Sequence, residues 1–330
     1  MNELLVNFGW LALGLVLLYY GAEWLVKGAA NISIKVGLTP LIVGLTVVAF
    51  GTSAPELLVS LQANMSGEGG GGFALGNVIG SNICNIALIL GVSAVIRPIN
   101  IHRQILTRDM PILLGITALF VWMLRDFTIT RIEAIVFVVA LVLYIGGSIV
   151  AGLSSSEEAE VEGMDAEEIA AAKSAGLGKV CFYFFLIILG LGFLMLGANR
   201  LIYGGVNIAR YYNVSEVLIA LSLVALGTSL PELATAVIAS KKKQGDIIVG
   251  NVVGSNLFNI LAVIGITALV APLQSSEIKV LDLCVMGGLT VGAMLFMFTG
   301  RALGRLEGII LLLIYGGYML YVFNTGDTQM

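Results

Sequence analysis

The chain has 330 residues, of which 58% are hydrophobic and 12% are charged, and its mean hydropathy is +1.00. About a quarter of the residues of a soluble globular protein are charged, so this composition excludes a soluble domain. The net charge of −4 comes from 17 basic and 21 acidic residues. The basic residues form no continuous stripe, which excludes nucleic-acid binding.

Ten apolar runs, separated by Pro, Gly and charged residues, follow one another along the chain. A helix needs about 20 apolar residues to cross a bilayer. The sequence therefore predicts an all-α polytopic membrane protein with ten transmembrane helices, at residues 4–29, 40–63, 72–95, 107–124, 132–151, 178–203, 214–240, 246–270, 280–299 and 305–323. Because the first basic residue, Lys27, follows a long apolar run, we expect the first segment to stay in the mature protein as a helix.

Two motifs occur twice along the chain. GTSAPEL at 51–57 returns as GTSLPEL at 227–233, and GNVIGSN at 76–82 returns as GNVVGSN at 250–256. They predict two five-helix repeats, residues 1–151 and 178–330, whose central motifs cover residues 44–91 and 220–265. An odd number of spans per repeat makes the second repeat enter the membrane from the opposite side. Inverted repeats with interrupted helices are typical of secondary transporters.

Glycines at seven-residue spacing are repeated in the same way. Three lie in the first predicted helix and three at corresponding positions in the sixth: Gly14, Gly21, Gly28, Gly190, Gly197 and Gly204. Small residues let helix backbones approach closely, so we expect these glycines to be packing positions between helices.

The distribution of Lys and Arg predicts the orientation in the membrane. Of the 17 such residues, 12 fall on one side of the predicted helices: Lys27, Lys35, Arg97, Arg103, Arg108, Lys173, Lys179, Lys241, Lys242, Lys243, Arg301 and Arg305. Positive charge marks the cytoplasmic side. We therefore expect a protein of the plasma (cell inner) membrane with both termini outside and residues 152–177 as an acidic, solvated cytoplasmic linker. Glu23 lies four residues before Lys27 and is expected to pair with it.

The first member of each motif pair places a carboxylate inside a predicted helix. Spacings of three and four residues put the polar side chains on one helix face, with Thr52, Ser53 and Glu56 in the second helix and Thr228, Ser229 and Glu232 in the seventh. The prolines at 55 and 231 free a backbone carbonyl four residues earlier. A carboxylate in the middle of a membrane costs about 2.5–3.5 kcal/mol on insertion scales, so it is a functional candidate. The alternative is a neutral carboxyl group hydrogen-bonded to the adjacent hydroxyls.

The second member of each pair adds neutral oxygens in the third and eighth helices: Ser81, Asn82, Asn85, Ser255, Asn256 and Asn259. Together with two carboxylates they predict an all-oxygen site, which suits sodium or calcium and not a soft transition metal. The alternative is that the Ser and Asn side chains hold helices together by hydrogen bonds.

The paired motifs GTSxPE and GNxxGSNxxN resemble the repeats of the sodium/calcium exchangers of the calcium/cation antiporter superfamily, in a prokaryotic member. The resemblance spans the whole chain and implies alternating access, with helices one and six as a gating pair. It implies that Glu56 and Glu232 are shared by both ions, with Asn85 and Asn259 completing the centre. The implied further ligands are the backbone carbonyls of Thr52 and Thr228 for calcium and of Ala49 and Ala225 for sodium, and the sodium-site hydroxyls of Ser53, Ser81, Ser229 and Ser255.

Two departures from the resemblance bear on function. Both Asn85 and Asn259 are neutral where many relatives have one aspartate, which argues against potassium co-transport. The linker of about 25 residues is too short for a folded regulatory domain.

Two carboxylates carry −2, which balances one Ca²⁺ or two Na⁺, so the two cations would compete for one site. Transport of more than two sodium ions per calcium would carry net charge and respond to voltage. A calcium/proton antiporter with the glutamates as proton carriers is the alternative. An intramembrane hydrolase is disfavoured because the motif helices hold no His or Lys as a base. We thus expect a transporter rather than an enzyme, with no cofactor, with calcium, sodium and the lipid bilayer as its partners, and functional as a monomer.

Overall fold

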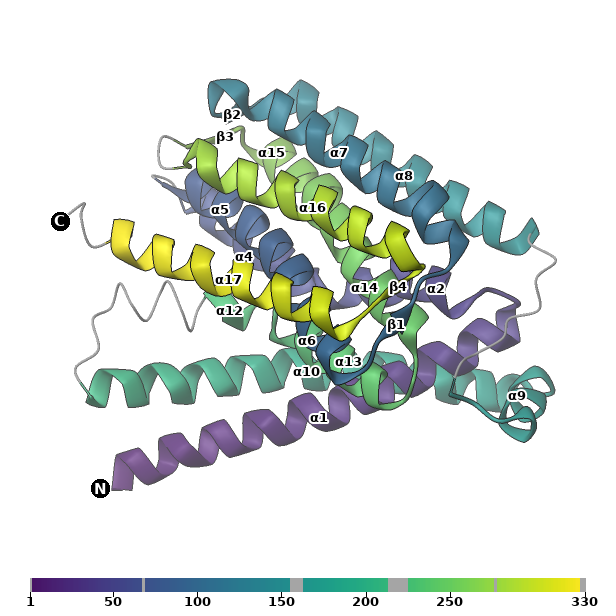
Figure 1. Ribbon diagram of the computed structural model, residues 1–330. Coiled ribbons are helices and arrows are strands. Elements are labelled where there is room, and N and C mark those ends of the chain that lie inside the picture. The colour runs from purple at the N-terminus through teal and green to yellow at the C-terminus, as the bar shows by residue number, and fades with distance from the viewer. Residues whose placement is uncertain (1, 67–68, 155–162, 213–224, 276–277, 327–330) are drawn as a thin grey trace.

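The computed structural model describes residues 2–66, 69–154, 163–212, 225–275 and 278–326, and Figure 1 shows their arrangement. Nine helical segments in these ranges are long and apolar enough to cross a membrane. They are Glu3–Val36, Pro40–Met65, Gly70–Ile96, Ile105–Asp126, Arg131–Ala151, Leu177–Tyr211, Gly245–Val270, Val280–Gly300 and Arg305–Asn324. The expected seventh helix, 214–240, lies partly outside the described residues. The prediction of an all-helical membrane protein is confirmed.

Several of these spans consist of shorter helical segments joined end to end, and others are single helices. The bounds of all helical segments are as follows. In the first half of the chain these are α1 (Asn2–Val36), α2 (Pro40–Val43), η1 (Gly44–Val48), α3 (Ala49–Thr52), α4 (Ala54–Met65), α5 (Gly70–Ile83), η2 (Cys84–Ile89), α6 (Leu90–Ile96), η3 (Ile105–Asp109), α7 (Met110–Met123), η4 (Leu124–Asp126) and α8 (Arg131–Ser154). In the second half they are α9 (Ala166–Lys173), α10 (Leu177–Tyr211), α12 (Ala225–Gly227), α13 (Leu230–Lys241), α14 (Gly245–Phe258), η6 (Asn259–Ile264), α15 (Gly265–Val270), α16 (Val280–Gly300) and α17 (Arg305–Gly326).

Helices α1 and α10 have 35 residues each and lie side by side in Figure 1. Helix α1 continues beyond its predicted end because Ala29, Ala30, Ile32 and Ile34 are buried. It stops at Gly37, whose φ of 77° suits glycine, and the Leu38 N–H closes the end by donating to the Ser33 carbonyl over 2.9 Å.

The repeated glycines lie at the contact between α1 and α10. An added Cβ on Gly21 would lie 2.9 Å from the Gly190 carbonyl oxygen, and one on Gly14 would lie 2.8 Å from the Gly197 carbonyl oxygen. Lower residue numbers on α1 pair with higher ones on α10, so the two helices are antiparallel. The prediction that these glycines are packing positions is confirmed.

Replacement of Gly21 by Ala is expected to lower the free energy of unfolding by about 1–3 kcal/mol, because the added methyl group forces the two backbones apart. Gly9→Ala is the matched control on the same helix, since an added Cβ there meets no described atom within 4 Å. The midpoint of thermal unfolding in detergent measures both. Equal midpoints for the two variants would contradict the tight contact.

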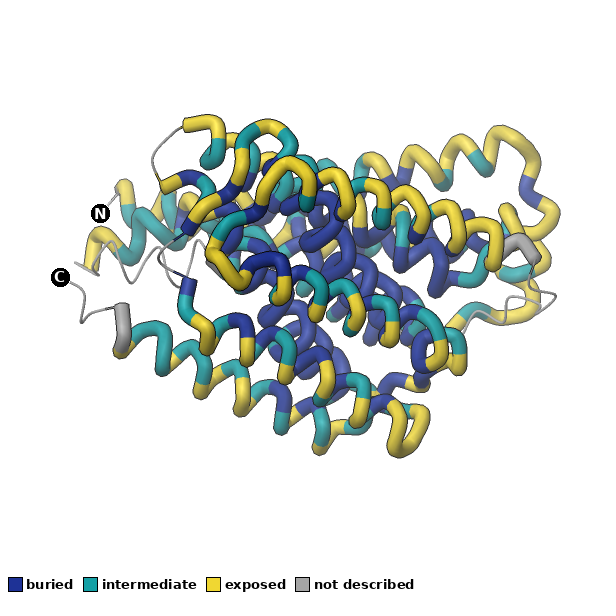
Figure 2. The backbone as a smooth tube through the Cα atoms, turned by 90° about the horizontal axis from the view of Figure 1, so that it is seen from above, coloured by how far each residue is buried: buried dark blue, intermediate teal, exposed yellow. Residues whose placement is uncertain are grey.

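Two pairs of interrupted spans form the middle of the molecule, where Figure 2 shows the buried residues. The chain leaves helical geometry at Ser53 (φ −86°, ψ 1°) and at Ser229 (φ −88°, ψ 4°), each two residues before the proline of its motif. In α14 every residue except Asp246 is buried. Helix α14 crosses η1 at close range, because an added Cβ on Gly250 would lie 2.6 Å from the Leu41 carbonyl oxygen and 3.1 Å from the Gly44 Cα.

Two short antiparallel strand pairs join the first half of the chain to the second. Strand β1 (Ile99–Asn100) pairs with β4 (Ala302–Leu303), with Ile99 opposite Leu303. Strand β2 (Thr128–Ile129) pairs with β3 (Leu273–Gln274), with Ile129 opposite Leu273. Helix α7 separates β1 from β2 along the chain, so the pairs lie at opposite ends of the helices (Figure 1). The sequence analysis did not predict them.

The segment expected to be a solvated linker contains the helix α9. A capping box starts it, in which the Glu168 N–H donates to the Asp165 carboxylate over 2.8 Å. Ala172 is buried, and the Lys35 ammonium on α1 donates to the Lys173 carbonyl over 3.1 Å. The sequence analysis did not predict this helix, of which only Ala172 is buried and the other residues are exposed or half-buried. The capping box and an alanine run favour a helix that docks on α1.

Candidate functional site

The two motif glutamates lie in the middle of the helix array with no exposed surface. Each starts a helix directly after a break in its span: Glu56 is in the first turn of α4 and Glu232 in the first turn of α13. The break places the N-terminal end of a helix, where N–H groups point outward, close to each carboxylate.

A serine hydroxyl contacts each of the two carboxylates. The Ser81 hydroxyl donates to Glu56 Oε1 and the Ser53 hydroxyl donates to Glu232 Oε1, each over 3.4 Å. The Ser81 and Ser229 Oγ atoms are 3.1 Å apart. The serines thus connect residues that are far apart along the chain, and the arrangement brings both motif copies into one site.

Four asparagines form a second network beside the carboxylates. The Asn85 amide donates to Asn256 Oδ1 over 2.9 Å, and the Asn259 amide donates to Asn82 Oδ1 over 3.0 Å. The Asn82 and Asn256 amides each donate to the other's backbone carbonyl over 3.4 Å. These bonds fix the orientation of each amide. As a result, the oxygens of Asn85 and Asn259 are left without a donor among the described residues.

The partnerless oxygens define what the site can hold. Glu56 Oε2, Glu232 Oε2, Asn85 Oδ1 and Asn259 Oδ1 are buried and have no hydrogen-bond partner among the described residues. Buried polar atoms are almost always satisfied, so four such oxygens from corresponding positions require an explanation. A hard cation would satisfy them, because carboxylate and amide oxygens are its preferred ligands. The described residues contain no cluster of three His, Cys, Asp or Glu side chains that would suit a transition metal.

The other predicted residues lie around these four oxygens to different degrees. Ala49 is buried, and its carbonyl accepts the Ser53 N–H over 3.0 Å. The hydroxyls of Thr228 and Ser255 are buried and without a partner among the described residues. Ala225 is the first residue of α12. The contacts of the described residues do not distinguish the predicted calcium ligands from the predicted sodium ligands.

The sequence analysis missed one polar residue of the site. The Thr52 hydroxyl donates to Asn251 Oδ1 over 3.1 Å, and Asn251 is fully buried. Its counterpart, Asn77, instead donates to the Ser60 hydroxyl over 3.0 Å. Both are the Asn of a repeated Gly-Asn pair, and that repetition was the available signal.

Comparison with known proteins agrees with this geometry. The family described as sodium/calcium exchanger protein matches residues 6–150 and 182–324, that is, in two halves. The chain is 35% identical over 316 residues to the putative antiporter CaxA of Alkalimonas amylolytica, covering 94% of this chain and 97% of that protein. It is 36% identical over 267 residues to the inner membrane protein YrbG of Escherichia coli (strain K12), covering 79% of each.

Two further similarities cover almost the whole chain. The sodium/calcium exchanger MaX1 of Methanosarcina acetivorans is 30% identical over 351 residues, covering 96% of this chain and 99% of that protein. The solved structure of the sodium-calcium exchanger NCX_Mj soaked with zero Na⁺ and Ca²⁺ superimposes with a TM-score of 0.83 at 29% identity, covering 97% of this chain and 99% of that one. The chain is therefore a member of the sodium/calcium exchanger family, a multi-pass membrane antiporter of cations and not an enzyme.

Proposed function

We propose that this antiporter exchanges Na⁺ for Ca²⁺ across the plasma membrane by alternating access. The observation that carries the proposal is the set of four buried, partnerless oxygens on Glu56, Glu232, Asn85 and Asn259. Two carboxylates carry −2, which one Ca²⁺ or two Na⁺ would balance. Because an empty site would leave two uncompensated charges in a low-dielectric interior, the conformational change would be favoured only with cations bound.

The polar groups around the four oxygens are the proposed further ligands of the two ions. The hydroxyls of Ser53, Ser81, Ser229 and Ser255 and the carbonyls of Ala49 and Ala225 would bind sodium, and the carbonyls of Thr52 and Thr228 would bind calcium. The support is that three of these hydroxyls are hydrogen-bonded within the carboxylate network. The Ser255 hydroxyl has no partner among the described residues. A proton carrier would need the glutamates alone and would leave these neutral oxygens without a role.

The proposed architecture is ten helices in two inverted five-helix repeats, residues 1–151 and 178–330, joined by the linker 152–177. Matching breaks at Ser53 and Ser229 and the antiparallel pairing of α1 with α10 support it. The positive-inside rule supports a cytoplasmic linker and termini that both lie outside. We further propose that a single chain is sufficient for transport.

Uptake of radioactive calcium into proteoliposomes tests the proposal. Vesicles loaded with sodium and diluted into sodium-free buffer are expected to take up calcium, and vesicles loaded with potassium are expected not to. If uptake ignored the sodium gradient and followed an imposed pH gradient, the protein would be a calcium/proton antiporter instead. An added membrane potential gives a second readout, since exchange of more than two sodium ions per calcium responds to voltage by about 2.3 kcal/mol per charge per 100 mV.

A further inference from the structure

The asparagines of the two repeated Gly-Asn pairs have different partners. In the second repeat, Asn251 accepts a hydrogen bond from the Thr52 hydroxyl of the first repeat over 3.1 Å, and both residues are buried. In the first repeat, Asn77 is only half-buried and donates to the Ser60 hydroxyl over 3.0 Å. The counterpart of Thr52 is Thr228, whose hydroxyl has no partner among the described residues. One asparagine thus bonds the threonine of the opposite repeat, and the other bonds a serine instead.

The packing around the two asparagines differs in the same sense. Helix α14 lies tightly against η1 and α3, because an added Cβ on Gly254 would lie 2.7 Å from the Leu45 carbonyl oxygen and 2.7 Å from the Ala49 Cβ. Gly254 is buried, whereas its counterpart on α5, Gly80, is half-buried. Helix α5 packs against α12 as α14 packs against α3. The contact of α14 with α3 is therefore closed, and the corresponding contact of α5 is looser.

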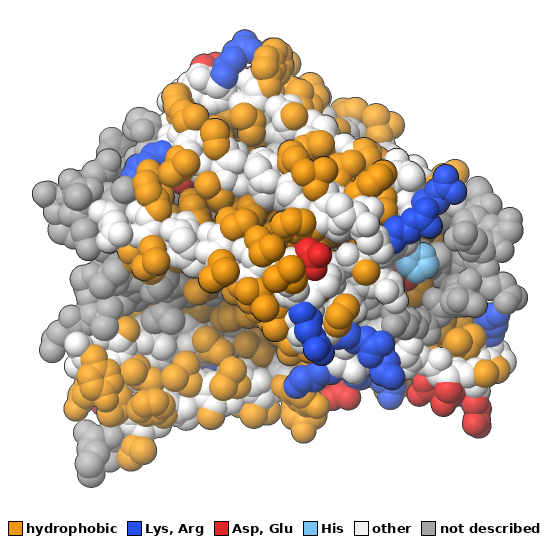
Figure 3. Space-filling model, viewed as in Figure 1, with side chains coloured by type: hydrophobic (Ala, Val, Ile, Leu, Met, Phe, Trp, Pro, Cys, Tyr) orange, Lys and Arg blue, Asp and Glu red, His pale blue; other side chains and the backbone are white. Residues whose placement is uncertain are grey.

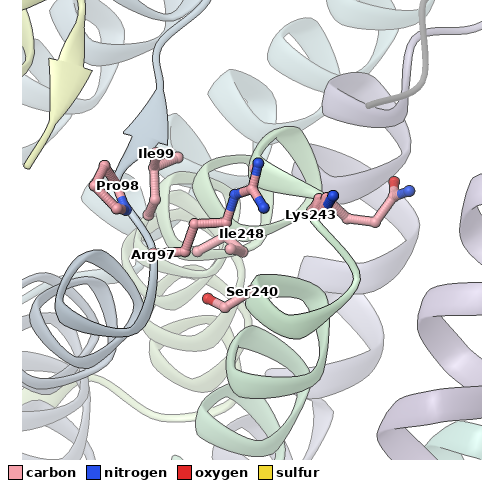
Figure 4. Close-up of a pocket in the computed structure, with 8 residues that line it drawn as sticks. Arg97, Pro98, Ile99, Ser240, Lys243 and Ile248 are labelled. Carbon is pink, nitrogen blue, oxygen red and sulfur yellow. The ribbon is translucent and has the colours of Figure 1, made fainter. Parts of the chain in front are cut away.

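The helix before each asparagine also differs between the repeats. The counterpart of Ser60 is Ala236 on α13, whose methyl group cannot form a hydrogen bond with Asn251. Figure 4 shows Ser240 of α13 and Ile248 of α14 at one small pocket. About one helical turn further from that pocket lie Ala236 on α13 and Asn251 on α14. The amide nitrogen of Asn251 has no partner among the described residues, so the first repeat alone gives its asparagine a bond on the preceding helix.

Few other groups can compete for these side chains. Hydrophobic side chains cover much of the surface in Figure 3, and lipid offers no hydrogen-bond partner. Buried polar groups are almost always bonded, so the free Thr228 hydroxyl requires an explanation. A second arrangement of the helices, in which Asn77 bonds Thr228 as Asn251 bonds Thr52 in the structure, would supply the missing partner.

We propose that Asn77 and Asn251 are positioning residues that alternately hold the two helix breaks of the ion site. In the structure, Asn251 ties α14 to α3 through Thr52, so the helices beside the first break cannot separate. When the helices beside the second break close instead, Asn77 bonds the Thr228 hydroxyl, and the bond between Asn251 and Thr52 opens. This inference rests on the proposed alternating access, and it assigns each closed state to one hydrogen bond between the repeats.

Two matched variants test the bond that the structure contains. Thr52→Val and Thr228→Val remove a hydroxyl at corresponding positions and keep the backbone carbonyls. Amide hydrogen exchange of the full chain in neutral detergent, measured by mass spectrometry over residues 49–57 and 225–233, compares them. Thr52→Val is expected to speed exchange in 49–57 about fivefold, as for the loss of one neutral hydrogen bond. Thr228→Val is expected to change neither segment, because its hydroxyl has no partner among the described residues. Equal effects of the two variants would overturn the proposal.

A double-mutant cycle tests the bond that forms only in the second arrangement. Thr228→Val and Asn77→Leu are each expected to lower the initial rate of sodium-dependent calcium uptake into proteoliposomes about fivefold, because each weakens the same closed state. The double variant is expected to lose no more than either single variant, since the same bond can be lost only once. A loss of about 25-fold in the double variant would make the two effects independent and would overturn the proposal.

Ser60→Ala is the matched control for Asn77→Leu, because it removes the bond that Asn77 makes in the structure. Its uptake is expected to equal that of the wild type. A fivefold loss would mean that Asn77 acts through Ser60 and would overturn the proposal. If the wild type itself shows no sodium-dependent uptake, the proposed ion exchange fails. The hydrogen-exchange comparison needs no ion gradient and decides the proposal in that case.

Discussion

Replacement of Glu232 by Gln is expected to lower sodium-dependent calcium uptake by about 100-fold or more. The carboxylate is fully buried, and one of its oxygens has no partner among the described residues. Loss of one of two charges leaves a bound Ca²⁺ with an uncompensated positive charge, and breaking a buried charge pair costs about 3–5 kcal/mol. Glu56→Gln should give the same loss, since Glu56 is as deeply buried. Initial rates of calcium uptake into sodium-loaded proteoliposomes, per amount of inserted protein, measure the effect.

Glu167→Gln is the matched control for this prediction. Glu167 is exposed in the first turn of α9, so the same chemical change there should leave uptake unchanged. The thermal unfolding midpoints of all three variants separate loss of ion binding from loss of fold. Normal uptake by either buried-site variant would remove the carboxylates from the mechanism.

Replacement of Gly250 by Leu is expected to destabilise the protein by more than about 3 kcal/mol, beyond the usual cost of one overpacked methylene. An added Cβ would lie 2.6 Å from the Leu41 carbonyl oxygen and 3.0 Å from the Leu45 N, both of them backbone atoms. Helix α14 is enclosed by other helices, so it has no direction in which to move. Asn256 of the asparagine network lies on the same helix, so we expect cation binding to be lost together with the fold.

The fraction of the Gly250→Leu protein that stays monodisperse after mild heating in detergent checks this prediction. Gly288→Leu on α16 is the control, because Gly288 is exposed and an added Cβ there meets no described atom within 4 Å. Equal recovery of the two variants would show that η1 and α14 can separate without cost.

Repetition within the chain predicted the positions of the two buried carboxylates. Glu56 and Glu232, each just after a break and next to a proline, lie where the paired motifs indicated. The hydrogen-bond partners were not predictable in the same way. Thr52 and Asn251 are 199 residues apart, and nothing in the spacing of either motif indicates that their side chains meet.

Charges near the helix ends were the weakest part of the sequence analysis. Glu23 was predicted to pair with Lys27, but its carboxylate instead lies 3.3 Å from the Lys242 ammonium at the end of α13. The local spacing indicated a partner on the same helix, but the fold places the Lys242 ammonium next to Glu23 instead. Helix α9 was missed because its acidic sequence was interpreted as a solvated linker, although Asp165 and Glu168 form a capping box that starts a helix.

The short strand pairs have a mechanical consequence for the two longest helices. Main-chain hydrogen bonds of β1–β4 and β2–β3 fasten the first half of the chain to the second at both ends of the bundle. Between α1 or α10 and that fastened frame, the described residues show no main-chain hydrogen bond, and the ion pair of Glu23 with Lys242 is made by side chains. Helices α1 and α10 could therefore shift together against the frame without breaking a main-chain hydrogen bond between them and the frame. The resistance to that movement would come from repacking of apolar side chains and from a few surface charges.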